Sequence, residues 1–336
     1  MLSDSYIDYI CDVKRYSPRT CEIYSAVLRE FSDFCEAEDD DTLISVLTPA
    51  MVRNYEVHLM DERGENPRTV GLHLSVLSGF AKFLMKDGHL NANPVRLVTR
   101  PKTSKRNPSF YRNEAMDAYF EATDHVADRE ALDTLMAFGG SVRTDKTAVE
   151  MYRARLRRLI VSLLAGTGMR RSELIGLTVG SVDMGRKVVK VLGKGDKARE
   201  IPLISSLCQE ISLYLQSVDT MVGSVRTASD PLLVTEKGAK LYPVYVDRAV
   251  KQELGNEPGI TGRKSPHVLR HTLATELLNN GTDLYSIKEL LGHSSLAATQ
   301  VYTHNSIEKL KTVYNNAHPR AKNGGNNGHP DQDPQV

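Results

Sequence analysis

The stretch SPHVLRHTLATELLNNGTDLYSIKELLGHSSLAATQVYTH, residues 265–304, decides the fold that we expect for the C-terminal part of the chain. It opens with Ser265 and Pro266, a helix N-cap followed by proline at the first helical position. This pattern predicts a helix that runs toward Asn280 and is closed by Gly281, because glycine readily takes the left-handed conformation that ends helices. A second helix is expected over about 284–291, before another glycine.

Four polar side chains in this stretch are candidates for catalysis. His267 and Arg270 are three residues apart, so they share a helix face near the helix N-terminus, where free N–H groups favour an anion. His293 follows the glycine after the second helix, and Tyr302 lies near the end of a further short helix. Each residue alone is more often a surface, packing or salt-bridge residue. The combination, together with upstream partners, supports a catalytic interpretation.

Length and composition indicate a soluble protein of two domains. The chain has 336 residues, of which 40% are hydrophobic and 25% charged, as in ordinary globular proteins. It has neither a long apolar run nor a secretory signal, so we expect no membrane span and a cytoplasmic location. The net charge of +1 does not by itself indicate nucleic-acid binding.

Cysteine and histidine spacing predicts neither a disulfide framework nor a metal site. The cysteines show no CxxC pair, and we expect all four to be reduced thiols. They are Cys11, Cys21, Cys35 and Cys208. His267 and His271 are four residues apart, but no HExxH pattern surrounds them. We therefore expect no metal and no cofactor.

The N-terminal region, about 1–95, has the pattern of a helical bundle. Apolar residues recur at helical spacing after three cap-and-proline starts, at 17–18, 48–49 and 66–67. These starts predict a compact bundle of about four helices. Basic residues near the helix starts, including Arg19 and Arg68, are candidates for contacts with DNA phosphates. A solvated charged face is an equal alternative.

A basic linker is expected after this bundle. Residues 94–107, PVRLVTRPKTSKRN, contain five basic residues, two prolines and no acidic residue, which is typical of an extended linker. Such a segment can lie along a phosphate backbone, although a merely soluble linker is the alternative. The candidate DNA contacts here are Arg100, Lys102, Lys105 and Arg106. The expected divisions are a bundle at 1–95, a linker at 96–110, a second domain at 111–320 and a disordered tail at 321–336.

The C-terminal region combines helices with one hairpin. Helices are expected over about 113–123, 129–138 and 148–165. A tight turn with two glycines follows, and Arg170 begins the next helix. Residues 181–185 are expected to be a loop. Strands are expected over 187–192 and 199–203, which places Lys194 at the tip of a hairpin. The GKG sequence there lacks the form of a nucleotide-binding P-loop.

The ordered set Arg170, Lys194, His267, Arg270, His293 and Tyr302 resembles the catalytic set of the tyrosine recombinases, also called the phage-integrase family. The surrounding sequences TGMRRSEL, VLGKGDKAREIPL and LLGHSSLAATQVYTH agree. The N-terminal bundle is similar to the SAM-like core-binding domain of the family, and the two-domain length is similar to the Xer-type members. The resemblance implies a mainly α fold with a small β-sheet in an α+β catalytic domain. The family pattern selects Arg170 rather than Arg171, which becomes a candidate phosphate-backbone contact.

The resemblance also implies a reaction. Tyr302 would attack a DNA phosphodiester and form a 3′-phosphotyrosyl link, with the two arginines binding the non-bridging oxygens. His267 would accept the tyrosine proton, His293 would donate a hydrogen bond to the phosphate, and Lys194 would protonate the 5′-hydroxyl leaving group. The covalent link would conserve the bond energy, so that rejoining needs no ATP.

Partners and cellular role follow from the same resemblance. It implies double-stranded DNA with a specific recombination site, a Holliday junction, and a homo- or hetero-tetramer in which residues 306–317 dock on a neighbouring protomer. It also implies chromosome-dimer resolution at a dif-like site during chromosome partition and cell division, with a septal DNA translocase as activator. The alternatives are an integrase or invertase of a mobile element, a type IB topoisomerase, and a catalytically silent DNA-architectural protein.

Overall fold

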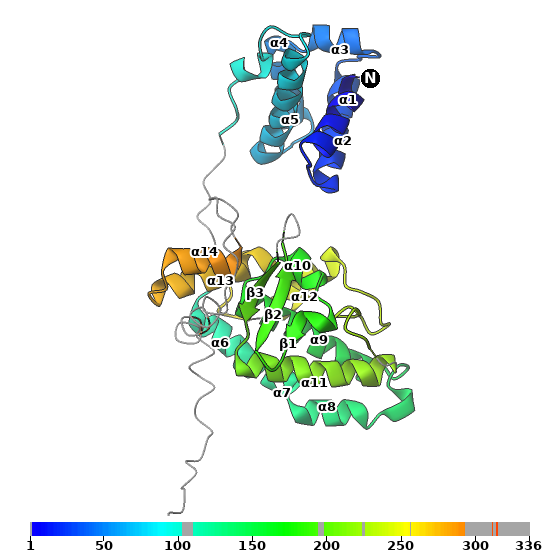
Figure 1. Cartoon of the computed structure of the whole chain (residues 1–336), viewed down its shortest axis with the longest axis vertical. Helices are drawn as coiled ribbons and strands as arrows, with labels where there is room; N and C mark the ends of the chain where they lie inside the picture. Colours follow the sequence, from blue (N-terminus) through cyan, green and yellow to red (C-terminus); the bar gives the residue numbers. More distant parts are fainter. Residues whose placement is uncertain are drawn as a thin grey trace, which may run out of the picture. The chain divides into compact units, whose positions relative to one another are not determined.

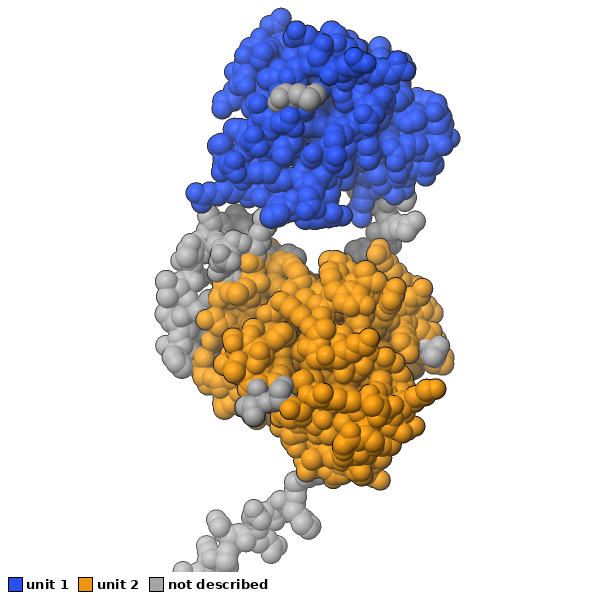
Figure 2. Space-filling view, turned by 90° about the vertical axis from the view of Figure 1, so that its right-hand side faces the viewer, with its two compact units in different colours: residues 1–106 blue, residues 107–336 orange. Residues whose placement is uncertain are grey.

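The computed structural model describes residues 2–102, 110–193, 198–223, 226–255, 257–292, 311 and 314. The chain forms two compact units, 1–106 and 107–336, coloured blue and orange in Figure 2. Each unit has its own hydrophobic core and is described by itself. No helix in the described ranges is long and apolar enough to cross a membrane.

The first unit is helical over its described residues (Figure 1). Its elements are α1 Leu2–Asp8, the π-helix η1 Tyr9–Val13, α2 Pro18–Phe34, α3 Asp40–Val46, α4 Pro49–Val57, the π-helix η2 His58–Glu62, α5 Pro67–Lys86 and the 3-10 helix η3 Pro94–Leu97.

The three cap-and-proline starts are confirmed. The hydroxyls of Ser17 and Thr48 each accept a backbone N–H from the first turn of their helix, at 3.2 Å. The Asn66 side chain accepts two such N–H groups, at 3.0 and 3.1 Å. Each cap satisfies backbone donors that have no partner inside the helix. The helices then close over an apolar core that includes Phe31 and Leu77.

Two expectations for this unit are wrong. The chain is not extended from position 94, because Pro94–Leu97 form a 3-10 helix, and Val95 and Val98 belong to the core of the unit at 5% and 6% exposure. Burial of these two apolar side chains stabilises the 3-10 helix, whereas an extended linker would leave them exposed to water. Furthermore, Cys11 and Cys21 are not free thiols. They are joined in a disulfide with a Cα–Cα distance of 6.2 Å.

The second unit combines helices with a small sheet (Figure 1). Its elements are α6 Asn113–Ala122, α7 Asp124–Ala127, α8 Arg129–Met136, the 3-10 helix η4 Gly139–Ser141, α9 Lys146–Thr167, α10 Arg171–Ile175, the 3-10 helix η5 Val179–Ser181, β1 Val182–Asp183, β2 Val188–Leu192, β3 Ala198–Pro202, α11 Ser205–Val222, α12 Pro243–Glu253, α13 Pro266–Asn279 and α14 Leu284–Leu291.

The sheet is antiparallel in the order β1-β2-β3. Val189 pairs with Ile201 on one side and Val182 on the other, which fixes the register. The expected hairpin strands are confirmed, whereas the expected loop over 181–185 is wrong at β1. A two-residue strand carries no recognisable alternation, so pairing with β2 alone defines it. Lys194, at the expected hairpin tip, lies outside the described residues.

Helix α9 is the central helix of this unit. It packs against α11, α12 and α13, and most of its C-terminal half is fully buried. It ends at Gly168, whose φ of +61° is the left-handed conformation that glycine takes without a steric cost. The position of α9 therefore fixes the turn that leads into Arg170.

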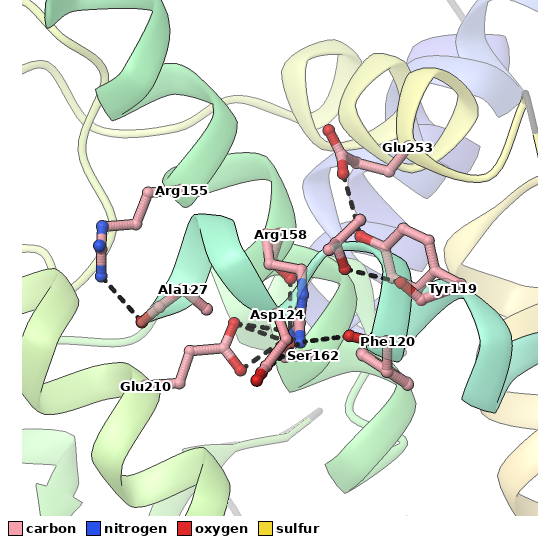
Figure 3. A network of polar contacts seen from close by, with 10 residues as sticks. Tyr119, Phe120, Asp124, Ala127, Arg155, Arg158, Ser162, Glu210 and Glu253 are labelled. Carbon is pink, nitrogen blue, oxygen red and sulfur yellow. Dashed lines mark hydrogen bonds and ion pairs between the residues drawn. The ribbon is translucent and has the colours of Figure 1, made fainter. Parts of the chain in front are cut away.

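The arginines of α9 make structural contacts (Figure 3). Arg158 is 1% exposed and donates to Glu210 of α11 at 3.1 and 3.2 Å, and to the carbonyl of Phe120 at 3.4 Å. Arg155 is 2% exposed and donates to the carbonyls of Ala127 and Asp128 at 3.0 and 2.7 Å. These side chains connect α9 to α6, α7, α8 and α11. Arg155 and Arg158 therefore stabilise the fold.

Replacing Arg158 by methionine is expected to destabilise the second unit by about 3–5 kcal/mol, because Glu210 would remain as a buried charge without its cation. Urea unfolding followed by circular dichroism measures the loss. The double variant Arg158→Met/Glu210→Leu should recover a large part of it, since both charges are then absent. Equal instability of the single and double variants would contradict this explanation.

Candidate active site

Helix α13 presents the His267–Arg270 pair on its first two turns. His267 is exposed, whereas Arg270, one turn later, is only 9% exposed. The helix begins at Pro266 as expected, but the Ser265 hydroxyl makes no capping bond. The two side chains thus start from one helix face, and the arginine points inward.

The Arg270 guanidinium links two segments that are distant in sequence. It donates to the carbonyl of Gly168 at 2.7 Å and to the carbonyl of Leu291 at 2.7 Å. Gly168 is packed tightly here, because a Cβ at this position would lie 2.6 Å from a Leu291 methyl and 3.0 Å from a Leu273 methyl. Only glycine fits both this packing and the positive φ. The α9–α10 turn and the end of α14 are therefore held together through Arg270.

Arg170 is the N-cap residue of α10 and contacts the same region. Its backbone N–H donates to Glu173 Oε2 at 2.7 Å, and its Nη1 donates to Glu173 Oε1 at 2.8 Å. Its Nη2 donates to the carbonyl of Gly292 at 2.8 Å. Arg170 keeps 36% of its side chain exposed, so it can also reach a ligand in solvent.

Two further residues complete the cluster, and the sequence reasoning did not assign them to the site. Glu173, 5% exposed, binds Arg199 through both carboxylate oxygens at 2.8 and 2.9 Å. Arg199, 7% exposed, also donates from Nε to the carbonyl of Leu290 at 2.9 Å. One signal was available for Arg199, because it occupies an inward-facing position of a strand, where an unpaired cation would be costly.

Three guanidiniums therefore meet the C-terminal end of α14. The carbonyls of Leu290, Leu291 and Gly292 each accept from a different arginine, where the helix carries free carbonyls and negative partial charge. Glu173 lies among these cations, with its Oε1 at 2.8 Å from both Arg170 Nη1 and Arg199 Nη1.

The pKa values reflect this crowding of charge. Burial, followed by the nearby Arg170 and Arg199 cations, lowers the pKa of Arg270 to about 10. Burial acts to raise the pKa of Glu173, but hydrogen bonds from Arg199 and Arg170 outweigh it and leave that pKa below its ordinary value. Both groups remain charged near pH 7, so three cations and one anion give an excess of positive charge, which favours an anionic ligand such as a phosphodiester.

Three of the six catalytic candidates lie outside the described residues, namely Lys194, His293 and Tyr302. Sequence adjacency still relates one of them to the cluster, because His293 directly follows Gly292. The described candidates are Arg170, His267 and Arg270. Through their backbone contacts, the two arginines converge on the end of α14.

The candidate DNA contacts differ in their surroundings. Arg19 is exposed and pairs with Glu22 at 3.0 Å, and Arg100 donates to the Ser75 hydroxyl at 3.1 Å. Arg68 and Lys102 are exposed. Arg171 pairs with Asp247 of α12. Lys105 and Arg106 lie outside the described residues.

The C-terminal segment 306–317 is described at two positions only. Tyr314 is 1% exposed, belongs to the core of its own unit, and donates its hydroxyl to the carbonyl of Gly166. Tyr314 therefore packs within its own unit, and docking of this segment on a neighbouring protomer stays a prediction. Apart from Lys311, the rest of the segment lies outside the described residues.

The opposite end of α13 carries a buried acid. Glu276 is 8% exposed and lines a groove of about 1060 Å³ together with residues of α6, including Glu114. Its Oε1 is buried and has no hydrogen-bond partner among the described residues. Burial, then repulsion from Asp117 and Glu114, raises the pKa of Glu276 to about 7.

Glu276→Gln is expected to stabilise the protein in alkaline buffer and to have little effect in acid. Because the folded-state pKa is raised, ionisation of Glu276 costs stability progressively as pH rises from about 4.5 through about 7. Glutamine removes that cost, worth about 3 kcal/mol at most. Chemical unfolding of both proteins at about pH 5 and about pH 8.5 tests this. An equal difference in the free energy of unfolding between the two proteins at both pH values would contradict this prediction.

Comparison with known proteins shows the family to which the chain belongs. The phage integrase family matches residues 142–309, and the phage integrase N-terminal SAM-like domain matches residues 4–88. Tyrosine recombinase XerC of Chlorobaculum parvum is 32% identical over 309 residues, covering 90% of this chain and 89% of the relative. Tyrosine recombinase XerC of Bacillus subtilis is 32% identical over 304 residues, covering 90% of each chain.

Solved structures share the fold. The XerH site-specific recombinase bound to palindromic difH substrate gives a TM-score of 0.63 at 17% identity, covering 96% of this chain and 84% of that one. The Tn1549 transposon integrase in complex with transposon right end DNA gives a TM-score of 0.62 at 17% identity, covering 92% and 97%. The mainly helical fold with a small sheet is thus confirmed, and the chain belongs to the phage integrase family of tyrosine recombinases, which makes it a site-specific DNA recombinase.

Proposed function

We propose that this recombinase cleaves DNA by attack of Tyr302 on a phosphodiester, leaving a 3′-phosphotyrosyl link. One observation carries the proposal. Arg170 and Arg270, from different helices, are both fixed against the last residues of α14, and His293 comes next in the chain. Two arginines held in this way can bind two phosphate oxygens, since a guanidinium presents its donors in a fixed fork and stays charged.

The cleavage step moves two protons. A bond forms between Tyr302 Oη and phosphorus as the bond from phosphorus to the 5′-oxygen breaks. His267, exposed at the start of α13, accepts the tyrosine proton, and Lys194 gives a proton to the departing 5′-oxygen. Arg170 and Arg270 stabilise the charge that builds on the non-bridging oxygens, each by roughly 3–4 kcal/mol, with a further hydrogen bond from His293.

Rejoining reverses the step with another strand. The 5′-hydroxyl of a partner strand attacks the phosphotyrosyl phosphorus and releases Tyr302, so the number of phosphodiester bonds is conserved. Two rounds of exchange pass through a Holliday junction. This scheme requires four active sites on two DNA duplexes, and hence a homo- or hetero-tetramer.

Both units would contact the DNA. The exposed Arg19 and Arg68 lie at the starts of α2 and α5, where side chains commonly reach phosphates. Arg100 and Lys102, with Lys105 and Arg106, would neutralise the backbone along the linker. We retain the division into a bundle, a basic linker, a catalytic domain and a tail, and we place the start of the linker after Val98 because of the buried 3-10 helix.

The cellular role that we favour is resolution of chromosome dimers at a dif-like site, in the cytoplasm and under control of a septal DNA translocase. Its support is the similarity to XerC proteins over nearly the full length of both chains. Integration or inversion of a mobile element uses the same chemistry, and so does a type IB topoisomerase. These roles differ in the DNA that is cut and in the product.

Covalent capture separates these roles. The protein is incubated with sheared, nicked DNA of its host, denatured, and the protein-linked fragments are sequenced. A single chromosomal locus near the replication terminus supports dimer resolution, whereas ends or inverted repeats of an element support integration or inversion. Fragments without a common sequence, together with relaxation of supercoiled plasmid, support a topoisomerase. Absence of adducts, both with and without host extract, would overturn the cleavage proposal.

A further inference from the structure

We infer that Arg199 is a positioning residue for the cleavage step, acting through Glu173 and the C-terminal end of α14. The inference rests on the function proposed above and adds to it a residue that touches no substrate. Arg199 is on β3, whereas Glu173 is on α10 and Leu290 on α14. It therefore joins β3 to two helices. Arg170 directly precedes α10, and Gly292 and His293 directly follow α14.

The contacts of Arg199 use its whole guanidinium. Two nitrogens form the fork-to-fork pair with the Glu173 carboxylate at 2.8 and 2.9 Å, and Nε donates to the Leu290 carbonyl at 2.9 Å. A bidentate pair of this kind fixes the carboxylate in one orientation. Glu173 Oε1 then accepts from Arg170 Nη1, and Oε2 accepts from the Arg170 backbone N–H. Arg199 thus sets the orientation of Arg170 indirectly, through Glu173.

Arg199 also affects the charge that Arg170 can offer to a phosphate. Glu173 is 5% exposed and has Arg170 as its other cationic partner. Without Arg199, the carboxylate would draw Arg170 into a closed ion pair and reduce the positive charge that Arg170 can offer to a phosphate. With Arg199 in place, the carboxylate is satisfied by a buried cation, and the cluster keeps an excess of positive charge for the substrate.

The packing around Arg199 shows how close it lies to the end of α14. Gly292 has a φ of +68°, and a Cβ there would lie 3.0 to 3.2 Å from three atoms of the Arg199 side chain. The chain therefore passes directly over the guanidinium just before His293. Movement of Arg199 would displace Gly292, whose carbonyl is a partner of Arg170.

Lysine cannot replace these contacts. An ammonium can bind Glu173 but cannot make the parallel pair and reach Leu290 at the same time. We therefore expect graded losses. Arg199→Met should lower the single-turnover rate of covalent adduct formation by about 10²-fold, as expected when catalytic groups are displaced by about 1 Å, and Arg199→Lys by about 10-fold. The affinity for DNA should stay within about threefold, because Arg199 is buried and reaches no phosphate.

Arg155→Met is the matched control. Arg155 is as deeply buried as Arg199, at 2% against 7% exposure, and it likewise donates to backbone carbonyls of its own unit. Its contacts lie on α7 and at the start of α8, and the one with Ala127 is drawn in Figure 3. Neither contact involves Glu173 or the end of α14. The Arg155→Met protein should be less thermally stable than wild type but should form the covalent adduct at the wild-type rate.

The experiment measures three quantities for wild type and the three variants. The probe is sheared, nicked host DNA, with adduct formation followed over time and affinity measured by filter retention. The third quantity is amide hydrogen exchange over residues 170–175 and 286–292, which does not depend on activity. Arg199→Met should raise exchange in both segments by about 10-fold or more, and Arg155→Met in neither.

Two results would overturn the inference. One is an Arg199→Met protein with the adduct rate and the exchange of wild type. The other is a loss of rate in Arg155→Met equal to that in Arg199→Met, since both would then report general instability. Absence of adducts with wild type would instead count against the proposed function. In that case, or if the methionine variant fails to fold, exchange in Arg199→Lys still decides whether Arg199 holds the two segments.

Discussion

A Tyr302→Phe protein is expected to form no covalent adduct with DNA, with the rate of strand cleavage lowered by roughly 10⁴-fold or more. The phenol oxygen would be the atom that bonds to phosphorus, and no other group in the proposed scheme can replace it. Binding should persist, because the arginine cluster and the exposed basic residues are intact. Adduct formation on nicked host DNA, resolved on a denaturing gel, measures the effect.

Tyr285→Phe is a suitable control for this prediction. Tyr285 lies on α14, is 64% exposed, and is close in sequence to the arginine cluster. Its variant should form adducts at the wild-type rate. Adducts that persist in Tyr302→Phe would show that another nucleophile is used, whereas loss of adducts in both variants would indicate damage to the α14 region rather than to the chemistry.

Arg170→Gln is expected to lower the rate of adduct formation by roughly 10²–10³-fold, the effect of removing one preorganised donor from a developing negative charge. Glutamine can keep a hydrogen bond to Glu173 or Gly292, so the fold should suffer less than the chemistry. The decisive measurement is the single-turnover rate at saturating DNA, because it separates the chemical step from affinity.

The neighbouring residue provides a close comparison for Arg170. Arg171 has 38% of its side chain exposed, against 36% for Arg170, but it pairs with Asp247 of α12. Arg171→Gln should therefore weaken DNA binding modestly and reduce its salt dependence, with little change in the rate at saturation. A larger loss of rate in Arg171→Gln than in Arg170→Gln would mean that the first catalytic arginine was assigned one position too early.

Local signals in the sequence were sufficient for most helices. Asn66 and Pro67 predict the start of α5, and the structure shows the cap that they form. The α13 and α14 boundaries were also predicted, because glycines follow both helices. In the second unit, the α-helices α7, α11 and α12 and the strand β1 are additions to the expected elements. Strand β1 has only two residues, and its pairing with β2 defines it.

The site was predicted less completely, for a physical reason. The order of the six candidate residues indicated Arg170 and Arg270 as site residues. The partners that hold these two side chains are distant in sequence. Glu173 and Arg199 are 26 residues apart, and Arg270 and Gly168 are 102 apart. Such pairs are created by packing of α9, β3, α13 and α14 and leave no periodic pattern. An extended linker was predicted at Val95 and Val98 because the neighbouring prolines and basic residues are typical of linkers, although both valines are core residues.

The meeting of three arginines at one helix end has a consequence for when the protein can break DNA. Arg170 caps α10, Arg199 lies on β3 and Arg270 lies on α13, and their shared target is the end of α14. These elements span about 120 residues, from Arg170 to Gly292, so the cluster exists only when that whole stretch has docked. A chain that is still folding would lack it. Under the proposed function, the geometry thus acts as a check on completion, since a chain in which these elements have not docked would lack the arranged arginines that cleavage requires.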